Sequence, residues 1–133
     1  MQSPNNTEIV QSAYAAFGRG DIQAILALLD DNVTWKGMYG AGPHVPTGGV
    51  RRGKAAVGEF FKQLAENVKF SQFEPREFIA TGEKVVTLGH FTAATPKNKQ
   101  FDADFAMVFT LRNGRVIGFQ EFTDSAAVNA AYL

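Results

Sequence analysis

The sequence predicts an α+β fold, because helical spacing of apolar residues in its first half gives way to strand-like alternation in its second half. Up to residue 66, apolar side chains recur every three or four positions, which places them on one face of a helix. From residue 68 onward, extended segments alternate with turn residues such as Gly82 and Asn113-Gly114. With 133 residues, 45% of them hydrophobic, we expect one domain over residues 1–133.

Three helices are predicted before the extended segments. The first follows Asn6-Thr7 and ends at Gly18 to Gly20; the second begins at the N-cap Asp21 and is stopped by Asp30 to Asn32. The third runs from about Lys54 to Glu66. Each carries an apolar stripe at helical spacing, and the stripes consist of Ile9, Val10, Ala13, Tyr14 and Phe17, then Ile22, Ile25, Leu26, Leu28 and Leu29, then Val57, Phe60, Phe61 and Leu64.

A glycine-rich segment from Gly37 to Gly53 interrupts this helical region. It follows a short strand that begins at Val33 and continues through Trp35. So long a loop in a compact domain is usually functional or mobile. Its apolar residues and His44 would suit closure over a cavity, and an ordinary connector is the alternative. The sequence leaves the roles of this loop and of His44 open.

Four long strands and a short final helix are predicted in the second half. The strands cover residues 68–80, 84–94, 101–111 and 116–123, and the helix covers residues 126–131 after the N-cap Asp124. Pro75 indicates an edge strand or a bulge, and Asn113-Gly114 is a strong hairpin signal. Because short turns join these strands, we expect them to pair as an antiparallel meander.

The strand from Phe105 to Leu111 is apolar at nearly every position, which predicts that both of its faces are covered. The helices can cover one face of the sheet. A second copy of the chain is the simplest cover for the other face. We therefore expect a homodimer through the outer sheet face, with an exposed apolar patch as the alternative.

The composition excludes several classes of function. Basic and acidic residues balance at 13 each, so no charge excess favours nucleic acid or an anionic membrane as a partner. There is no Cys, and the two His are far apart in the sequence, so neither thiol chemistry nor a metal site is expected. The N-terminal segment from Met1 to Asn6 lacks signal character, and no apolar run is long enough to span a membrane. A cytoplasmic protein is the expectation.

Short motifs spread in order over nearly the whole chain resemble those of SnoaL-like domains. The motifs are Tyr14-x-x-Phe17-x-x-Gly20-Asp21, Leu29-Asp30-Asp31-Asn32-Val33-x-Trp35, Gly53-Lys54-x-x-Val57-x-x-Phe60-Phe61, Val85-Val86, Phe109-x-Leu111-x-Asn113-Gly114-Arg115-Val116 and Glu121-Phe122-x-Asp124. Such domains belong to the nuclear-transport-factor-2-like superfamily, which includes steroid isomerases and polyketide cyclases.

The resemblance implies a cone-shaped α+β barrel. In this fold, three N-terminal helices pack on a curved mixed or antiparallel sheet around an apolar cavity, and a short helix ends the chain. The resemblance also implies a homodimer formed through the outer sheet face. It does not assign a reaction, because the superfamily mixes enzymes with non-catalytic modules.

Glu121 is the main candidate for chemistry. The resemblance places the face of the last strand that carries Phe119, Glu121 and Thr123 inward, and Glu121 stands where related polyketide cyclases carry a catalytic Asp. A carboxylate in an apolar pocket has a raised pKa, which suits a general base that enolises a carbon acid. The alternative is a structural contact of Glu121 with a nearby cation or backbone N–H.

His90 and Tyr14 are the candidate partners of Glu121. Leu88, His90 and Thr92 share a strand face that by resemblance is the pocket face, so His90 would polarise a substrate carbonyl. Tyr14 aligns with the oxyanion-hole tyrosine of steroid isomerases. The two Asp positions of those isomerases fall at Gly37 and Met107, so the steroid-isomerase mechanism is not expected. A wall residue and a packed core tyrosine are the alternatives for His90 and Tyr14.

The remaining expectations concern the lining and the surface. Asp102 and Asp104 are expected on the outer face, solvated or at the dimer rim. The expected apolar lining of the ligand site consists of Trp35, Phe60, Leu64, Leu88, Phe105, Met107, Phe109 and Phe119. Two functions stay open: a cofactor-free isomerase or cyclase that acts on a small hydrophobic carbonyl compound, or a non-catalytic module that binds a small ligand or a protein partner.

Overall fold

The α+β prediction is confirmed by the computed structural model, which describes residues 5–133. Residues 1–4, part of the N-terminal segment that lacks signal character, lie outside the described residues. The elements in chain order are α1 (Asn6–Gly18), α2 (Ile22–Ala27), β1 (Leu29–Lys36), β2 (Val50–Arg52), α3 (Lys54–Asn67), β3 (Lys69–Thr81), β4 (Lys84–Ala94), β5 (Gln100–Arg112), β6 (Arg115–Thr123) and α4 (Ser125–Ala131).

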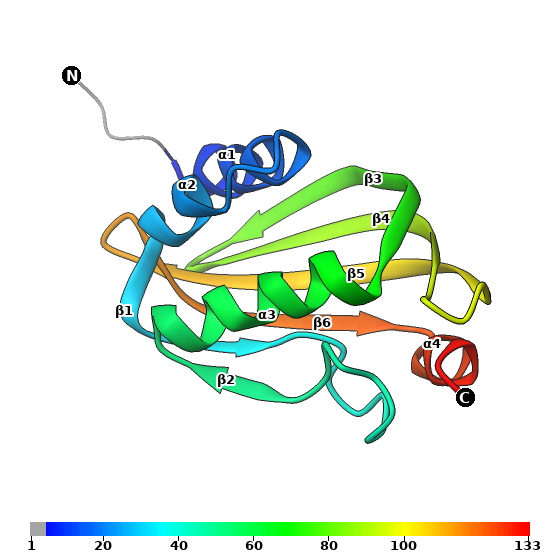
Figure 1. Cartoon of the computed structure of the whole chain (residues 1–133). Coiled ribbons are helices and arrows are strands. Elements are labelled where there is room, and N and C mark those ends of the chain that lie inside the picture. Colours follow the sequence, from blue (N-terminus) through cyan, green and yellow to red (C-terminus); the bar gives the residue numbers. More distant parts are fainter. Residues whose placement is uncertain (1–4) are drawn as a thin grey trace.

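The strands form one six-stranded sheet in the order β2-β1-β6-β5-β4-β3. All neighbours pair antiparallel except β1 and β6, which pair parallel. The sheet is curved and does not close, and α1, α2 and α3 lie on its concave face, while α4 follows the end of β6 (Figure 1). The mixed sheet, the three N-terminal helices and the short C-terminal helix therefore match the predicted cone.

Two local expectations in the first half of the chain are wrong. The second helix ends at Ala27, and Leu29 to Asn32 begin β1 instead of stopping the helix. Leu29 is buried and pairs with Val116 of β6. Its place in the sheet gives its backbone polar groups hydrogen-bond partners and at the same time buries its side chain. The short strand β2 was not predicted, since three residues beside a glycine-rich loop show no alternation.

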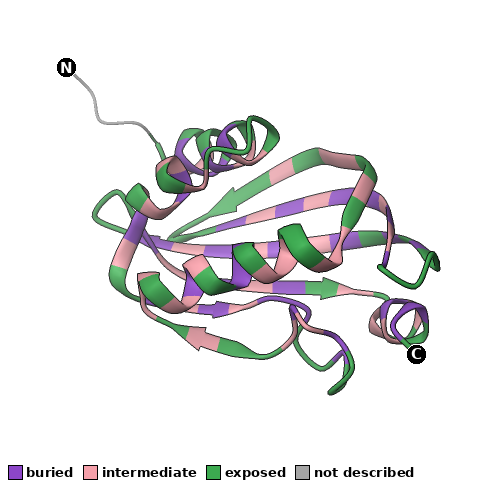
Figure 2. Ribbon diagram, viewed as in Figure 1, coloured by how far each residue is buried: buried purple, intermediate pink, exposed green. Residues whose placement is uncertain are grey.

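Burial alternates along the central strands, which separates an inner face from an outer face (Figure 2). On β4 the inner residues are Val85, Thr87, Gly89, Phe91 and Ala93. The expectation that Leu88 and His90 face the pocket is therefore wrong, because both lie on the outer face. On β6 the inner face carries Phe119 and Glu121, as predicted.

Most turn and cap predictions agree with the structure, but the N-cap of α1 is Asn5, whose side chain accepts from the Glu8 N–H, and not the predicted Asn6-Thr7. Pro75 lies on the edge strand β3, and the pairing register shifts between Pro75 and Glu77. Asn113 and Gly114 both have positive φ in the hairpin between β5 and β6. Asp21 and Asp124 cap α2 and α4 through side-chain hydrogen bonds. Within residues 5–133, no helix has both the length and the hydropathy needed to cross a membrane.

Candidate functional site

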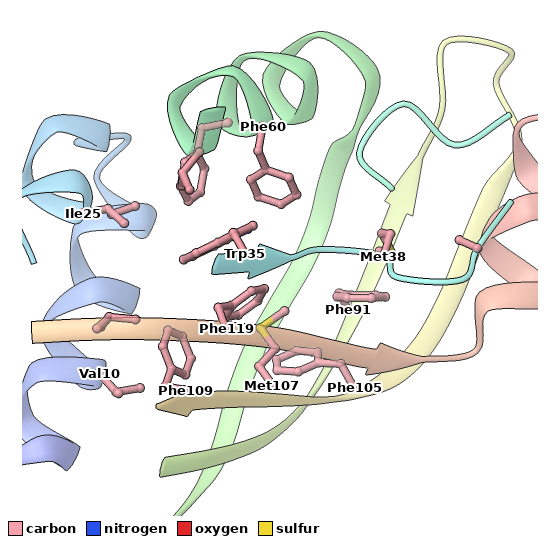
Figure 3. Packing of buried hydrophobic residues seen from close by; sticks show 14 of the residues in the cluster. Val10, Ile25, Trp35, Met38, Phe60, Phe91, Phe105, Met107, Phe109 and Phe119 are labelled. Atoms are coloured by element: carbon pink, nitrogen blue, oxygen red, sulfur yellow. The ribbon is translucent and has the colours of Figure 1, made fainter. Parts of the chain in front are cut away.

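An apolar cavity of about 70 Å³ lies between the helices and the concave face of the sheet. Aromatic rings form most of its wall, and Figure 3 shows several of them converging from α3, β1, β5 and β6. The lining residues are Ala13, Tyr14, Phe17, Ile25, Trp35, Met38, Thr47, Phe60, Phe61, Leu64, Phe70, Phe73, Phe91, Met107, Phe109, Phe119 and Glu121. No Lys, Arg or His belongs to this described lining, so Glu121 is its one charge-bearing carboxylate.

Glu121 reaches the cavity from β6 and is only 6% exposed. Its Oε1 accepts a hydrogen bond of 3.0 Å from the backbone N–H of Met38. Burial raises the pKa of Glu121 from 4.5 to about 7, although the Met38 hydrogen bond acts in the opposite direction. Glu121 can therefore exchange a proton near neutral pH, as a general acid or base must.

The loop between β1 and β2 supplies the N–H group that Glu121 binds. Met38 has a φ of 45°, a left-handed conformation that is uncommon for a residue other than glycine. The Arg51 guanidinium holds the loop by donating to the carbonyl oxygens of Pro46, Thr47 and Gly48 at 3.2–3.3 Å. The loop thus forms part of the cavity wall, through Met38 and Thr47.

Tyr14 lies in the same cavity on α1. Its hydroxyl donates to the Sδ atom of Met107 at 3.2 Å, and a thioether is a weak acceptor. Burial raises the pKa of Tyr14; the nearby Thr87 hydroxyl acts in the opposite direction, and the negative charge of Glu121 raises the pKa further. The Tyr14 hydroxyl therefore stays protonated near neutral pH and can donate to a ligand oxygen.

The two positions at which steroid isomerases carry Asp have other uses in this chain. Met107 accepts the Tyr14 hydrogen bond and pairs with Glu121 across β5 and β6. A side chain at Gly37 would collide with the ring of Phe60, so this position has no room for a carboxylate unless Phe60 moves. The cavity wall therefore carries Glu121 but neither of the two carboxylates that the steroid-isomerase mechanism requires.

Most of the predicted lining residues do line the cavity. Tyr14, Glu121 and six of the eight apolar candidates are among its wall residues, the six being Trp35, Phe60, Leu64, Met107, Phe109 and Phe119. Leu88 is not, because it lies on the outer face of β4. Phe105 is buried but packs behind the wall, with its ring 5.3 Å from the ring of Phe91 and 5.4 Å from the ring of Phe73.

His90 is separated from Glu121 by the sheet itself. Its Nδ1 lies 2.7 Å from Oδ1 of Asp104, and its Nε2 contacts Oδ1 of Asp102. Hydrogen bonds to Asp104 and then Asp102 raise the pKa of His90. Asp102 and Asp104 are exposed on the outer face, as expected, and they hold His90 there. The structure therefore does not bring His90 together with Glu121 and Tyr14.

Several wall residues were missed in the sequence. Phe17 and Phe61 belong to predicted apolar helix stripes, but the stripes do not show that these two side chains point into the cavity. Phe91 alternates with His90 and would have been found if the inner face of β4 had been assigned correctly. Thr47 carries no sequence signal, because the loop around it has no periodicity. Within residues 5–133, no group of three or more His, Asp or Glu side chains is arranged to hold a metal ion.

Comparisons with known proteins agree with this architecture. A family model for the SnoaL-like domain matches residues 10–119. The crystal structure of an NTF2-like protein from Burkholderia xenovorans LB400 is 32% identical, with 96% of this chain and 95% of that chain covered and a TM-score of 0.86. An NTF2-like protein of unknown function from Burkholderia pseudomallei K96243 is 26% identical, with 98% of both chains covered and a TM-score of 0.85.

A third structure is that of TerC, co-crystallised with polyporic acid. It is 25% identical to this chain, with 96% of this chain and 97% of that chain covered and a TM-score of 0.79. None of the curated proteins compared with the chain matches it.

Proposed function

This chain belongs to the SnoaL-like domain family, and from that premise we propose that its cavity binds a small hydrophobic carbonyl compound on which Glu121 acts as general acid and base. The observation that carries the proposal is the position of one carboxyl, with a pKa of about 7, in a cavity otherwise lined by apolar and aromatic groups. The reaction class is cofactor-free proton transfer of the isomerase or cyclase kind.

The proposed step begins with ionised Glu121. The carboxylate takes a proton from the carbon next to the ligand carbonyl, the C–H bond breaks, and its electron pair forms an enolate. The Tyr14 hydroxyl exchanges its weak bond to the Met107 sulfur for a stronger one to the enolate oxygen. Protonated Glu121 then returns a proton to carbon, at the same atom or at a conjugated one.

Ligand binding without chemistry is the second candidate. The crystal of TerC with polyporic acid supports it, because a structurally similar protein was obtained together with an organic ligand. In that case Glu121 would only orient the ligand.

Deuterium exchange tests the enzymatic proposal with acetone as the probe. Wild-type protein in D₂O is expected to exchange the α protons of acetone faster than buffer, with a rate that rises as the pH increases through about 7. Glu121→Gln should lower the protein-dependent rate by about 100-fold or more. His90→Gln is the matched control and should retain the rate, because His90 lies on the opposite face of the sheet. Equal rates for wild type and Glu121→Gln would refute the role of Glu121.

We also propose that the chain forms a homodimer through the outer sheet face. Apolar residues of four neighbouring strands lie on this face, with Ile79 and Phe122 respectively 45% and 51% exposed. The others are Val86, Leu88, Ala106 and Val108, and register pairing places them side by side. Sedimentation velocity should give a dimer for wild type and a monomer for Phe122→Lys. A monomeric wild type over the micromolar range would contradict the proposal.

A further inference from the structure

We infer that the cavity holds an oxygen atom of a neutral ligand through two side chains not yet assigned a polar role, the Trp35 indole N–H and the Thr47 hydroxyl. This inference deepens the proposed function and rests on it, because it describes how the same cavity recognises its ligand. Both side chains line the cavity.

The first observation is that both polar atoms are buried without a hydrogen-bond partner. Trp35 is 4% exposed and Thr47 is 1% exposed. Within residues 5–133, neither Trp35 Nε1 nor Thr47 Oγ1 has a hydrogen-bond partner. Buried polar groups are nearly always paired, because removing them from water unpaired is costly. Four buried side-chain atoms of the described residues lack a partner, and those of Trp35 and Thr47 are the two that belong to residues of this cavity wall, whereas those of Thr87 and Asn129 do not. Their gathering in one wall is what points to a bound molecule as their partner.

The second observation is that the indole ring is held rigidly beside Glu121. Trp35 pairs in register with Phe119, and their rings stack with centroids 4.0 Å apart. Phe60 packs on the indole from α3, as Figure 3 shows, with a centroid distance of 5.7 Å. Phe119 lies two residues before Glu121 on the same strand face. A fixed donor on the strand next to Glu121 suits a ligand whose reacting atom must meet that carboxyl.

Thr47 is held by the loop. Its carbonyl oxygen accepts a 3.2 Å hydrogen bond from Arg51, whose guanidinium also lies 5.3 Å from the centroid of the Phe60 ring. Arg51 thereby fixes the backbone of Thr47 while its charge stays outside the cavity lining. The Thr47 hydroxyl is left as an uncharged group that can donate or accept.

These groups define the chemical class of ligand. An indole N–H can only donate, so it requires an acceptor such as a ketone, aldehyde or ester oxygen. An anionic ligand would find no cation in the described lining and would face Glu121, so it would be buried without a counter-charge. The cavity of about 70 Å³ is about half the ~150 Å³ of an engineered cavity that admits benzene. A small neutral carbonyl group is therefore the best fit.

The test uses the indole N–H as a direct reporter, because the chain has one Trp. In ¹⁵N-labelled protein the single indole resonance is followed during titration with acetone and, separately, with dichloromethane, a probe of similar size without an oxygen acceptor. Acetone should move the indole proton downfield in a saturable manner, and dichloromethane should not.

Variants separate the hydrogen bond from cavity filling. Trp35→Phe should weaken acetone binding, followed at backbone amides of the lining, by about five- to tenfold, and should leave dichloromethane affinity unchanged within about twofold. Thr47→Val should act in the same direction. Equal indole shifts with both probes, unchanged acetone affinity in Trp35→Phe, or no acetone binding to wild type would each overturn the inference.

The two experiments distinguish failure of this inference from failure of the proposed function. If acetone shows the indole shift and the Trp35→Phe loss but no deuterium exchange occurs, the donor site stands and the catalytic role of Glu121 falls. His90→Gln serves as the second control and should retain the downfield indole shift with acetone, because His90 lies on the outer face of the sheet.

Discussion

Replacing Glu121 with Gln should make the folded protein clearly more stable than wild type at pH 8 and much less so at pH 5. The carboxyl has a pKa of about 7 in the folded protein against an ordinary value of 4.5. A raised pKa means that the folded state binds the proton more tightly than the unfolded chain. The stabilisation is fully present below pH 4.5 and is lost as the pH rises through about 7.

The size of the effect follows from these two values. Stability falls by about 1.4 kcal/mol for each pH unit between them, which amounts to about 3 kcal/mol by pH 8. Gln keeps an oxygen that can accept the Met38 N–H and has no charge to bury. The difference in free energy of unfolding between Glu121→Gln and wild type should therefore grow from about 1 kcal/mol at pH 5 to about 3 kcal/mol at pH 8.

Urea unfolding at pH 5, 6, 7 and 8, at one protein concentration, measures this difference. Fluorescence of Trp35, the chain's one Trp, reports unfolding because the side chain is buried in the native state. Glu66→Gln, a change at an exposed carboxylate of α3, is the matched control and should follow the wild-type pH dependence. A constant difference from pH 5 to pH 8 would show that Glu121 does not titrate near neutrality, and the general-base argument would fail with it.

Three further outcomes are expected. Asp124→Ala removes the N-cap of α4 and should cost about 1 kcal/mol in urea unfolding; no loss would contradict the capping role. Gly89→Ala should cost about 1–3 kcal/mol, because its Cβ would collide with a backbone oxygen of β3; wild-type stability would refute the close packing. NMR titration should give His90 a pKa above 6.5, because its contacts with Asp104 and Asp102 favour the protonated ring. These contacts stabilise the fold fully below pH 6.5, and the stabilisation is lost as the pH rises through the raised pKa. Asp102→Asn should lower that pKa, and an unchanged value would argue against the contact.

Much of the fold was predictable because local signals agree with tertiary structure. The predicted bounds of β4 are those observed, since its alternation ends at turns on both sides. The caps Asp21 and Asp124 and the hairpin at Asn113 act through hydrogen bonds or backbone angles close to them in sequence. The parallel pairing of β1 with β6 has no such local signal, because its partners are far apart in the chain.

The error at His90 shows a different limit. Alternation separates the two faces of a strand but does not say which face is inward. Both faces of β4 mix apolar and polar residues, so neither stands out. The hairpin between β4 and β5 holds the missing information: its register pairs His90 with Asp104, and paired residues share a face. Since Asp104 was placed outside, His90 had to be outside too.

The cavity, unlike the fold, depends on groups that no sequence pattern predicts. The N–H that reaches Glu121 comes from Met38 in a left-handed conformation, and Thr47 enters the wall from a loop without periodicity. The resulting cavity wall has one ionisable carboxyl, that of Glu121, and two donors that stay protonated, the Tyr14 hydroxyl and the Trp35 indole. A site with a single carboxylate in its described lining must take up and return a proton through the same group. That favours reactions in which a proton is moved between carbon atoms of one substrate over hydrolyses that need a separate acid and base.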